Sequence, residues 1–246
     1  MPPTALIVGV RGLGRVIARH FASQGWRVIA AARTQATVDA VAGEITAAGG
    51  TGIGITCDLQ NRESLRAAVD AAGALDLVVA AQTSGIRFGA RPFLEIDDSE
   101  LDGVFSAYVR GTWNLLKAVG PTLTAQRCGT FLQIGTSSGV RTRAEWAPLG
   151  TAQHGLRALV QIVAKEWRPH GVHVAYVPID GGIKRDAAPA VRDATDAIRT
   201  AADEAPRSLD PQEIARACAY LHAQDRSAWT HELVMRPTGT DWTAPT

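Results

Sequence analysis

A glycine-rich turn near the start of the chain, Gly9-Val10-Arg11-Gly12-Leu13-Gly14, constrains its fold more than any other stretch. A short apolar run, residues 4–8, precedes the turn, and a segment with apolar residues at helical spacing, residues 15–24, follows it. Glycines let the backbone approach a pyrophosphate, whose charge is met by free amides at a helix start. The sequence therefore predicts a dinucleotide-binding βαβ unit, with cofactor contacts at Gly9, Gly12, Leu13 and Gly14.

The second expected strand, residues 28–32, ends at Arg33. A fold selective for NAD would place Asp or Glu there to hold the ribose hydroxyls, whereas Arg suits a 2′-phosphate. Arg11, inside the glycine turn, can reach the same region. The two arginines favour NADP(H) over NAD(H) as the cofactor, although either one could be an ordinary surface charge.

Strand and helix patterns alternate through the rest of the chain. Helices are expected over 35–48, 62–72, 98–123, 149–167 and 211–222, and strands over 53–57, 75–81, 130–136, 172–178 and 232–236. The sequence predicts one Rossmann-type, doubly wound α/β domain over residues 1–246, with a seven-stranded parallel sheet and helices on both faces. The Ala-, Asp- and Arg-rich segment 184–206 is interpreted as a lid over the pocket, or alternatively as a plain pair of surface helices.

Composition narrows the possible partners. A chain of 246 residues with 46% hydrophobic residues can bury a sizeable core, and a net charge of +1 gives no reason to expect nucleic acid or an anionic membrane. No apolar run approaches a membrane span, and no signal sequence precedes the first strand. Cys57, Cys128 and Cys218 lack metal-ligand spacing. We expect a cytoplasmic protein with reduced cysteines, no metal and a small-molecule substrate.

The spacing of the glycine turn resembles the Thr-Gly-x-x-x-Gly-x-Gly turn of the short-chain dehydrogenase/reductase (SDR) superfamily, with one residue fewer and with Val8 in place of Thr. The turn that starts at Thr136 matches the register of the family's Ser-x-x-Gly, and the resemblance extends from Ala5 to about Pro237. The family's Asn-Asn-Ala-Gly after the fourth strand is lost, since Ala80-Ala81-Gln82-Thr83 stands there.

The resemblance implies further contacts and an assembly. It places the Asp58 carboxylate, followed by Leu59, against the adenine amino group, although Asp at a strand end is also a common turn former. It places Ile183 in the loop that meets the nicotinamide. It also implies a homodimer or homotetramer formed through the two long helices, which are expected to begin near Asp98 and Leu149.

The family's proton-transfer machinery is missing. In the family a Tyr protonates the substrate oxygen, a Lys four residues later lowers the pKa of that phenol and holds the ribose, a Ser orients the carbonyl and an Asn holds a water. The same register here carries Leu149 at the Tyr, Gln153 at the Lys, Thr136 at the Ser and Tyr108 at the Asn. Independently of register, no Tyr-x-x-x-Lys occurs anywhere in the chain. Because a positioned acid contributes about 10²–10⁴ in rate, ordinary ketone reduction should be badly impaired.

Three side chains are the candidates for the remaining chemistry. The Thr136 hydroxyl could bind a substrate oxygen or simply cap its own turn, Gln153 could hydrogen-bond a ribose without adding charge, and Tyr108 could act as a replacement acid. On the loop before the helix, Glu145 is read as a solvated side chain or a general acid/base, and Trp146 as part of the pocket wall. His154 is read as a packing or interface residue.

Three functions remain open. The first is an atypical NADP(H)-dependent reductase acting on an imine, an iminium ion or a polarised C=C bond, which accepts hydride without building an alkoxide. The second is a non-redox enzyme on the same scaffold, such as a cyclase, isomerase or dehydratase. The third is a non-catalytic dinucleotide-binding homologue.

Overall fold

The computed structural model describes residues 1–85, 89–184 and 208–239. Apart from Lys184, the segment predicted as a lid, 184–206, therefore lies outside the described residues. Two short strands flank the undescribed segment, β7 (Gly182–Ile183) before it and β8 (Ser208–Leu209) after it. They form a separate parallel pair.

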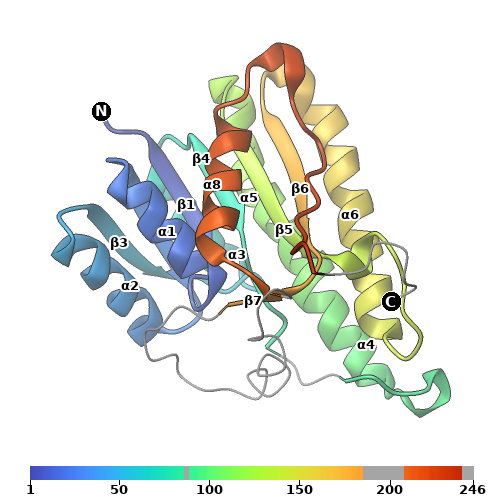
Figure 1. Ribbon diagram of the computed structural model, residues 1–246. Coiled ribbons are helices and arrows are strands. Elements are labelled where there is room, and N and C mark those ends of the chain that lie inside the picture. Colours follow the sequence, from blue (N-terminus) through green and yellow to red (C-terminus); the bar gives the residue numbers. More distant parts are fainter. Residues whose placement is uncertain (86–88, 185–207, 240–246) are drawn as a thin grey trace.

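The centre of the fold is a six-stranded parallel sheet in the order β3-β2-β1-β4-β5-β6 (Figure 1). Its strands are β1 (Thr4–Val8), β2 (Arg27–Ala32), β3 (Thr51–Thr56), β4 (Leu77–Ala80), β5 (Thr130–Thr136) and β6 (His173–Ile179). The order reverses beside β1, between β1 and β4. In open α/β sheets, ligands bind at the carboxyl ends of the strands at such a reversal.

Helices cover both faces of the sheet, as expected for a doubly wound fold (Figure 1). One face packs against α1 (Leu13–Ser23), α2 (Gln35–Ala47) and α8 (Pro211–His222). The other face packs against α3 (Arg62–Ala72), α4 (Asp98–Phe105), α5 (Gly111–Gln126) and α6 (Ala147–Trp167). Every residue of β1, β4 and β6 is buried, which explains the nearly continuous apolar runs of these strands.

The predicted seventh strand, 232–236, is wrong as a regular strand. The segment does run parallel to β6, but it pairs only through two isolated bridges, Tyr176 with Glu232 and Ile179 with Met235. The backbone N–H of Leu233 donates to Tyr176 O, and that of Met235 donates to Pro178 O. Between these bonds a regular ladder would need an N–H from residue 178. Proline has none, so the ladder is interrupted there.

The long helix predicted over 98–123 is interrupted by one wide turn. Residues Ser106–Arg110 form a π-helical segment between α4 and α5. Such π segments insert an extra residue into a helix and are frequent at functional sites. Tyr108 lies in the middle of this segment and is buried.

None of the helices in the described ranges is long and apolar enough to span a membrane.

Candidate functional site

The glycine turn after β1 is packed against the end of β4. Gly9 has φ +91°, and a Cβ on it would lie 2.7 Å from the backbone of Ala81 and Gln82. A Cβ on Gly14 would lie 2.5 Å from the carbonyl oxygen of Gly9. A Cβ on Gly12 would meet nothing within 4 Å. Gly9 and Gly14 are therefore required by the packing of the turn itself, while Gly12 faces open space.

Helix α1 begins directly after this turn. Its N-cap, Gly12, provides no side-chain hydrogen bond, and its first turn contains no acidic residue. The first N–H groups of a helix have no partners within it, so an uncapped, acid-free start can receive an anion. Leu13, the first residue of the helix, is half-buried against the core on this face of the sheet. The geometry at the turn fits a pyrophosphate.

Arg11 and Arg33 both reach the loop that follows β4. Arg11 Nη2 lies 3.4 Å from Thr83 Oγ1, and a Cβ built on Gly85 would lie 2.8 Å from Arg33 Nη2. Two residues of extended chain span at most about 7 Å, so the two guanidinium groups approach the same short loop. Arg33 is exposed and pairs with no carboxylate that the structure describes. Together they provide positive charge beside the turn, as a 2′-phosphate would require.

At the end of β3, Asp58 is exposed, and its Oδ1 accepts a hydrogen bond of 3.0 Å from the N–H of Gln60. The residue thus forms its own turn, whether or not it also meets a ligand. The side chain of Leu59 packs in the core, and its carbonyl oxygen accepts from Asn114 Nδ2 at 2.8 Å. The side chain of Leu59 therefore belongs to the core rather than to a ligand site.

A hydrogen-bonded chain of Gln82, Thr112 and Gln133 stands at the end of β4, where the Asn-Asn-Ala-Gly motif is lost. Gln82 Nε2 donates to Thr112 Oγ1 at 2.8 Å, and this hydroxyl donates to Gln133 Oε1 at 2.9 Å. Gln133 Nε2 in turn donates to the carbonyl oxygens of Ala80 and Ile134. These bonds tie β4 and β5 to α5, so the sheet remains cross-linked where the family motif is absent.

At the carboxyl end of β5, two of the three catalytic candidates are in direct contact. The backbone N–H of Thr136 lies 3.3 Å from Gln153 Oε1 on α6. The Thr136 hydroxyl accepts a hydrogen bond of 3.2 Å from the N–H of Ser138, so it caps its own turn while its proton remains available to a ligand. Leu149, one helical turn before Gln153, is buried in the core.

A buried tyrosine on β6, Tyr176, joins this pair and was not predicted from the sequence. Its hydroxyl donates to Gln153 Oε1 at 3.2 Å and lies 3.5 Å from the carbonyl oxygen of Thr136. A Cβ on either Gly135 or Gly139 would overlap the phenol. These two glycines were the only sequence signal of Tyr176, since they leave the space that its ring occupies.

The Tyr176 phenol is less acidic than a solvent-exposed phenol. Burial raises the pKa of its phenol well above the usual value, and the carbonyl of Thr136 and the charge of Arg157 offset this only partly. Tyr108, the third candidate, is buried near Tyr176, and a negative charge on it would raise the pKa of Tyr176 further. The Tyr176 phenol is therefore neutral at physiological pH and serves as a hydrogen-bond donor.

All three tyrosines and all three lysines of the chain lie among the described residues. Lys117 is on α5 with its ammonium 5.6 Å from the centroid of the Trp113 ring, and Lys165 is exposed near the end of α6. Lys184 is exposed after β7. None of them stands one helical turn after a tyrosine, so the ammonium that would activate a phenol in the family is missing from its position.

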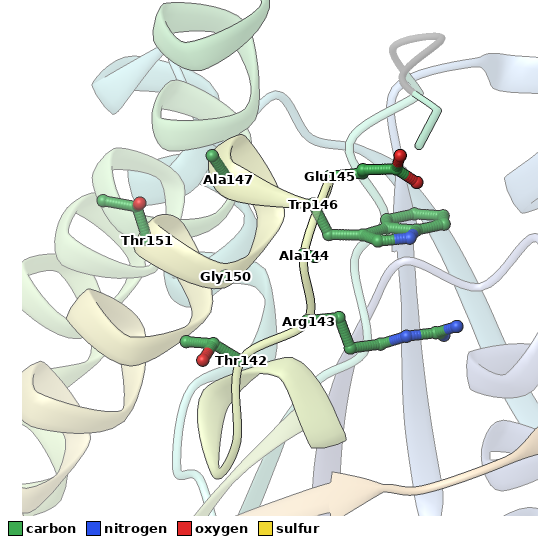
Figure 2. Close-up of a pocket in the computed structure, with 8 residues that line it drawn as sticks. All are labelled: Thr142, Arg143, Ala144, Glu145, Trp146, Ala147, Gly150 and Thr151. Atoms are coloured by element: carbon green, nitrogen blue, oxygen red, sulfur yellow. The ribbon is translucent and has the colours of Figure 1, made fainter. Parts of the chain in front are cut away.

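The loop between β5 and α6 borders a cavity of about 320 Å³. Figure 2 shows the side chains of Arg143, Glu145 and Trp146 projecting to one side of this loop, with Thr142 and Thr151 on the other. The Arg143 guanidinium lies 5.7 Å from the centroid of the Trp146 ring. Glu145 has φ +67°, unusual for a residue other than glycine, and its carbonyl oxygen accepts from the N–H of Arg91. Trp146 lines the cavity, as expected, and Glu145 is exposed beside it.

Near the end of β6, Asp180 is buried and forms ion pairs with Arg141 and Arg236. These pairs hold the loop after β5 and the C-terminal segment against the start of the loop that carries Ile183. Ile183 is half-buried in β7. His154 is half-buried on α6, where its Nδ1 lies 2.9 Å from the carbonyl oxygen of Gly150. Within the described ranges, no group of three His, Cys, Asp or Glu side chains could hold a metal ion.

A parallel sheet with this strand order, a glycine turn at its first crossover and a polar cluster at the end of β5 define a nucleotide-binding α/β fold of the Rossmann type. A family model described as "Enoyl-(Acyl carrier protein) reductase" matches residues 8–239. The chain belongs to the short-chain dehydrogenase/reductase superfamily, a family of oxidoreductases.

Named relatives and solved structures agree with this assignment. The chain is 28% identical to the 3-oxoacyl-[acyl-carrier-protein] reductase FabG of Vibrio cholerae over 93% of each chain. It is 30% identical to the galactitol 2-dehydrogenase (L-tagatose-forming) of Cereibacter sphaeroides over 85% of this chain and 83% of the relative. A metagenomic short-chain oxidoreductase solved in complex with NADP is 26% identical, with a TM-score of 0.73 over 97% of this chain and 98% of the other.

Proposed function

We propose that this chain is an NADP(H)-dependent oxidoreductase that transfers hydride to an imine, an iminium ion or a polarised C=C bond rather than to an ordinary ketone. One contrast carries the proposal. The glycine turn with its Arg11, and Arg33 after β2, lie beside the strand reversal, whereas Leu149 and Gln153 occupy the positions where the family has its Tyr and Lys.

Each part of the cofactor has residues that suit it. Gly9, Gly12, Leu13 and Gly14 would admit the pyrophosphate at the start of α1, and Arg11 and Arg33 would bind the 2′-phosphate. Asp58 and the backbone of Leu59 would meet the adenine, and Ile183 the nicotinamide. The NADP complex of a relative 26% identical supports the same choice. Bound NADPH supplies a hydride from its nicotinamide ring.

The charge that develops during hydride transfer favours some acceptors over others. When hydride reaches a ketone carbon, negative charge builds on oxygen and needs a proton donor, and a positioned acid is worth about 10²–10⁴ in rate. A neutral imine would first take a proton from solvent and become an iminium ion. When hydride reaches the iminium carbon, the positive charge disappears and a neutral amine forms with no further proton required. When it reaches a polarised C=C bond, the charge spreads over the conjugated system as an enolate, which solvent can protonate afterwards.

Three residues of the site would then have separate roles. The Thr136 hydroxyl would donate to a polar atom of the substrate, Gln153 would bond the ribose, and Tyr108 would lie at the buried side of the pocket as the one candidate acid. The relatives' names leave ketones as the rival acceptor, since FabG is named a 3-oxoacyl reductase. The family model's description, an enoyl reductase, names a C=C bond.

A binding and turnover measurement tests the proposal. NADPH is titrated into the protein by fluorescence, and loss of its absorbance is then followed with cyclic imines, enones and ketones at matched concentrations. We expect binding, with turnover of an imine or enone at least tenfold faster than that of any ketone. Fast ketone turnover would contradict the choice of acceptor, and failure to bind NADPH would remove the whole proposal.

Two other results would identify the rival functions. Conversion of substrate without consumption of NADPH would indicate a cyclase, isomerase or dehydratase, for which the exposed Glu145 beside the cavity is the available general acid/base. Binding without any conversion would indicate a non-catalytic homologue.

We further propose that residues 1–246 act as one domain and assemble into a homodimer or homotetramer through α4, α5 and α6. Large apolar side chains on these helices are solvent-exposed in the single chain, namely Leu101, Phe105, Trp113 and Ile162. Sedimentation velocity at micromolar concentration tests this, and a single monomeric boundary would contradict it.

A further inference from the structure

We propose that Tyr176 is a positioning residue, whose buried hydroxyl fixes the side-chain amide of Gln153 so that Nε2 is presented as a donor to an oxygen of the bound ligand. The identity of that ligand, a dinucleotide with its ribose hydroxyls, rests on the proposed function. The orientation of the amide rests only on the contacts within the chain.

The orientation follows from what each neighbour can do. The backbone N–H of Thr136 can only donate, so the atom that faces it at 3.3 Å must be the amide oxygen. The Tyr176 phenol has one proton, and Gln153 Oε1, at 3.2 Å, is its nearer acceptor. Two donors therefore converge on Oε1 from different strands, and the NH₂ group is left pointing elsewhere.

The NH₂ group has no hydrogen-bond partner among the residues that the structure describes. Gln153 Nε2 is buried without a hydrogen bond, and the whole residue is inaccessible to solvent. A buried donor without an acceptor lowers stability, and such exceptions in native proteins call for an explanation. A ligand oxygen that accepts from Nε2 would remove this cost. Because the residue is inaccessible to solvent, binding must also displace a neighbouring group to open a path to Nε2.

The space for Tyr176 is built into β5 and the 3-10 turn that follows it. Its ring fits only because residues 135 and 139 are glycines, since a Cβ at either position would overlap the phenol. The hydroxyl is thus held by backbone on two sides and has little freedom to swing away from Gln153. The arrangement is rigid, as positioning a side chain requires.

A double-mutant cycle tests whether Tyr176 acts through Gln153. The dissociation constant for NADPH is measured for the wild type, Tyr176→Phe, Gln153→Ala and the double variant. We expect Tyr176→Phe to weaken binding by about 3- to 10-fold, the usual effect of one hydrogen bond, and Gln153→Ala by at least as much. In the Gln153→Ala background, Tyr176→Phe should have no further effect. An equal loss in both backgrounds, or no loss in either, would overturn the proposal.

Tyr220→Phe is the matched control, because Tyr220 is exposed on α8. It should leave binding unchanged, and all variants are first compared with the wild type by circular dichroism and thermal unfolding. A loss of affinity in the control equal to that of Tyr176→Phe would also count against the positioning role.

A second readout does not depend on activity or on the cofactor. The side-chain amide signals of Gln153 in an ¹⁵N spectrum are assigned by their loss in Gln153→Ala. In the ligand-free protein, Tyr176→Phe should shift and broaden them, and NADPH should shift them in the wild type. Unchanged signals in Tyr176→Phe would refute the contact even if the protein bound no dinucleotide. Unchanged signals on saturation with NADPH would refute the donor role alone.

Discussion

The substitution Gly14→Ala tests most directly how closely the start of α1 packs against the backbone of the glycine turn. A Cβ there would lie 2.5 Å from the carbonyl oxygen of Gly9, about 1 Å inside an ordinary van der Waals contact. The neighbouring atom is backbone and cannot rotate away, so α1 must shift against β1. Overpacking of this kind costs about 1–3 kcal/mol. In a chain of this size, that lowers the melting temperature by about 2–4 °C for each kcal/mol.

Gly43→Ala makes the same chemical change inside α2, where a Cβ would meet nothing within 4 Å. Alanine replaces the more flexible glycine there, which should raise stability by about 0.5–1 kcal/mol. Thermal unfolding and urea titration at pH 7.5 measure both variants. We expect opposite signs, together with loss of NADPH binding only in Gly14→Ala. A Gly14→Ala protein as stable as Gly43→Ala, with unchanged NADPH binding, would refute the account of the turn.

Three further predictions follow from the site and the core. Arg33→Ala should weaken NADPH binding by about 10-fold or more without changing NADH binding, because a charge-assisted hydrogen bond to phosphate is worth about 1.5–3 kcal/mol. Isothermal titration calorimetry measures both affinities, and equal losses for the two cofactors would argue against a 2′-phosphate contact. Burial lowers the pKa of His173 and of His222 in the folded chain, so below about pH 6.5 the unfolded chain binds more protons than the folded one. The free energy of unfolding should therefore be highest above about pH 6.5 and fall below it, by up to about 1.4 kcal/mol per pH unit for each histidine. Equal free energies from urea unfolding at pH 7.5 and 5.5 would contradict this. The double substitution Leu149→Tyr/Gln153→Lys should raise the rate of NADPH-dependent ketone reduction at least tenfold, since a positioned acid contributes about 10²–10⁴ in rate. No gain in a folded variant that binds NADPH would show that more than these two residues is missing.

Local sequence patterns predicted most of the sheet and helices because each is set by its own residues. The apolar patterns of residues 130–136 and 62–72 predicted β5 and α3 with the same bounds that the structure has. The segment 232–236 was predicted as a strand, but its pairing depends on Pro178 in the neighbouring strand β6. A missing N–H on a neighbouring strand leaves no trace in the segment itself.

The candidate site was predictable only where the chain keeps a local motif. The glycine turn is one such motif, and the structure shows the close backbone approach that its glycines allow. Tyr176 was missed because a tyrosine within a buried strand looks like any other core residue. Its contact with Gln153 depends on space left by Gly135 in β5 and by Gly139 in the turn after β5, which only the folded chain brings next to β6. The π-helical turn around Tyr108 was missed because the helical apolar pattern continues through it.

Transfer of deuterium from the cofactor tests the central claim most directly. NADPH carrying two deuterium atoms at C4 of the nicotinamide ring is incubated with the protein and either a cyclic iminium salt or a ketone of matching size. The masses of the products are measured by mass spectrometry. The account predicts an amine one mass unit heavier, formed at least tenfold faster than any deuterated alcohol. A deuterated alcohol formed as fast as the amine, or an altered substrate without deuterium, would contradict it.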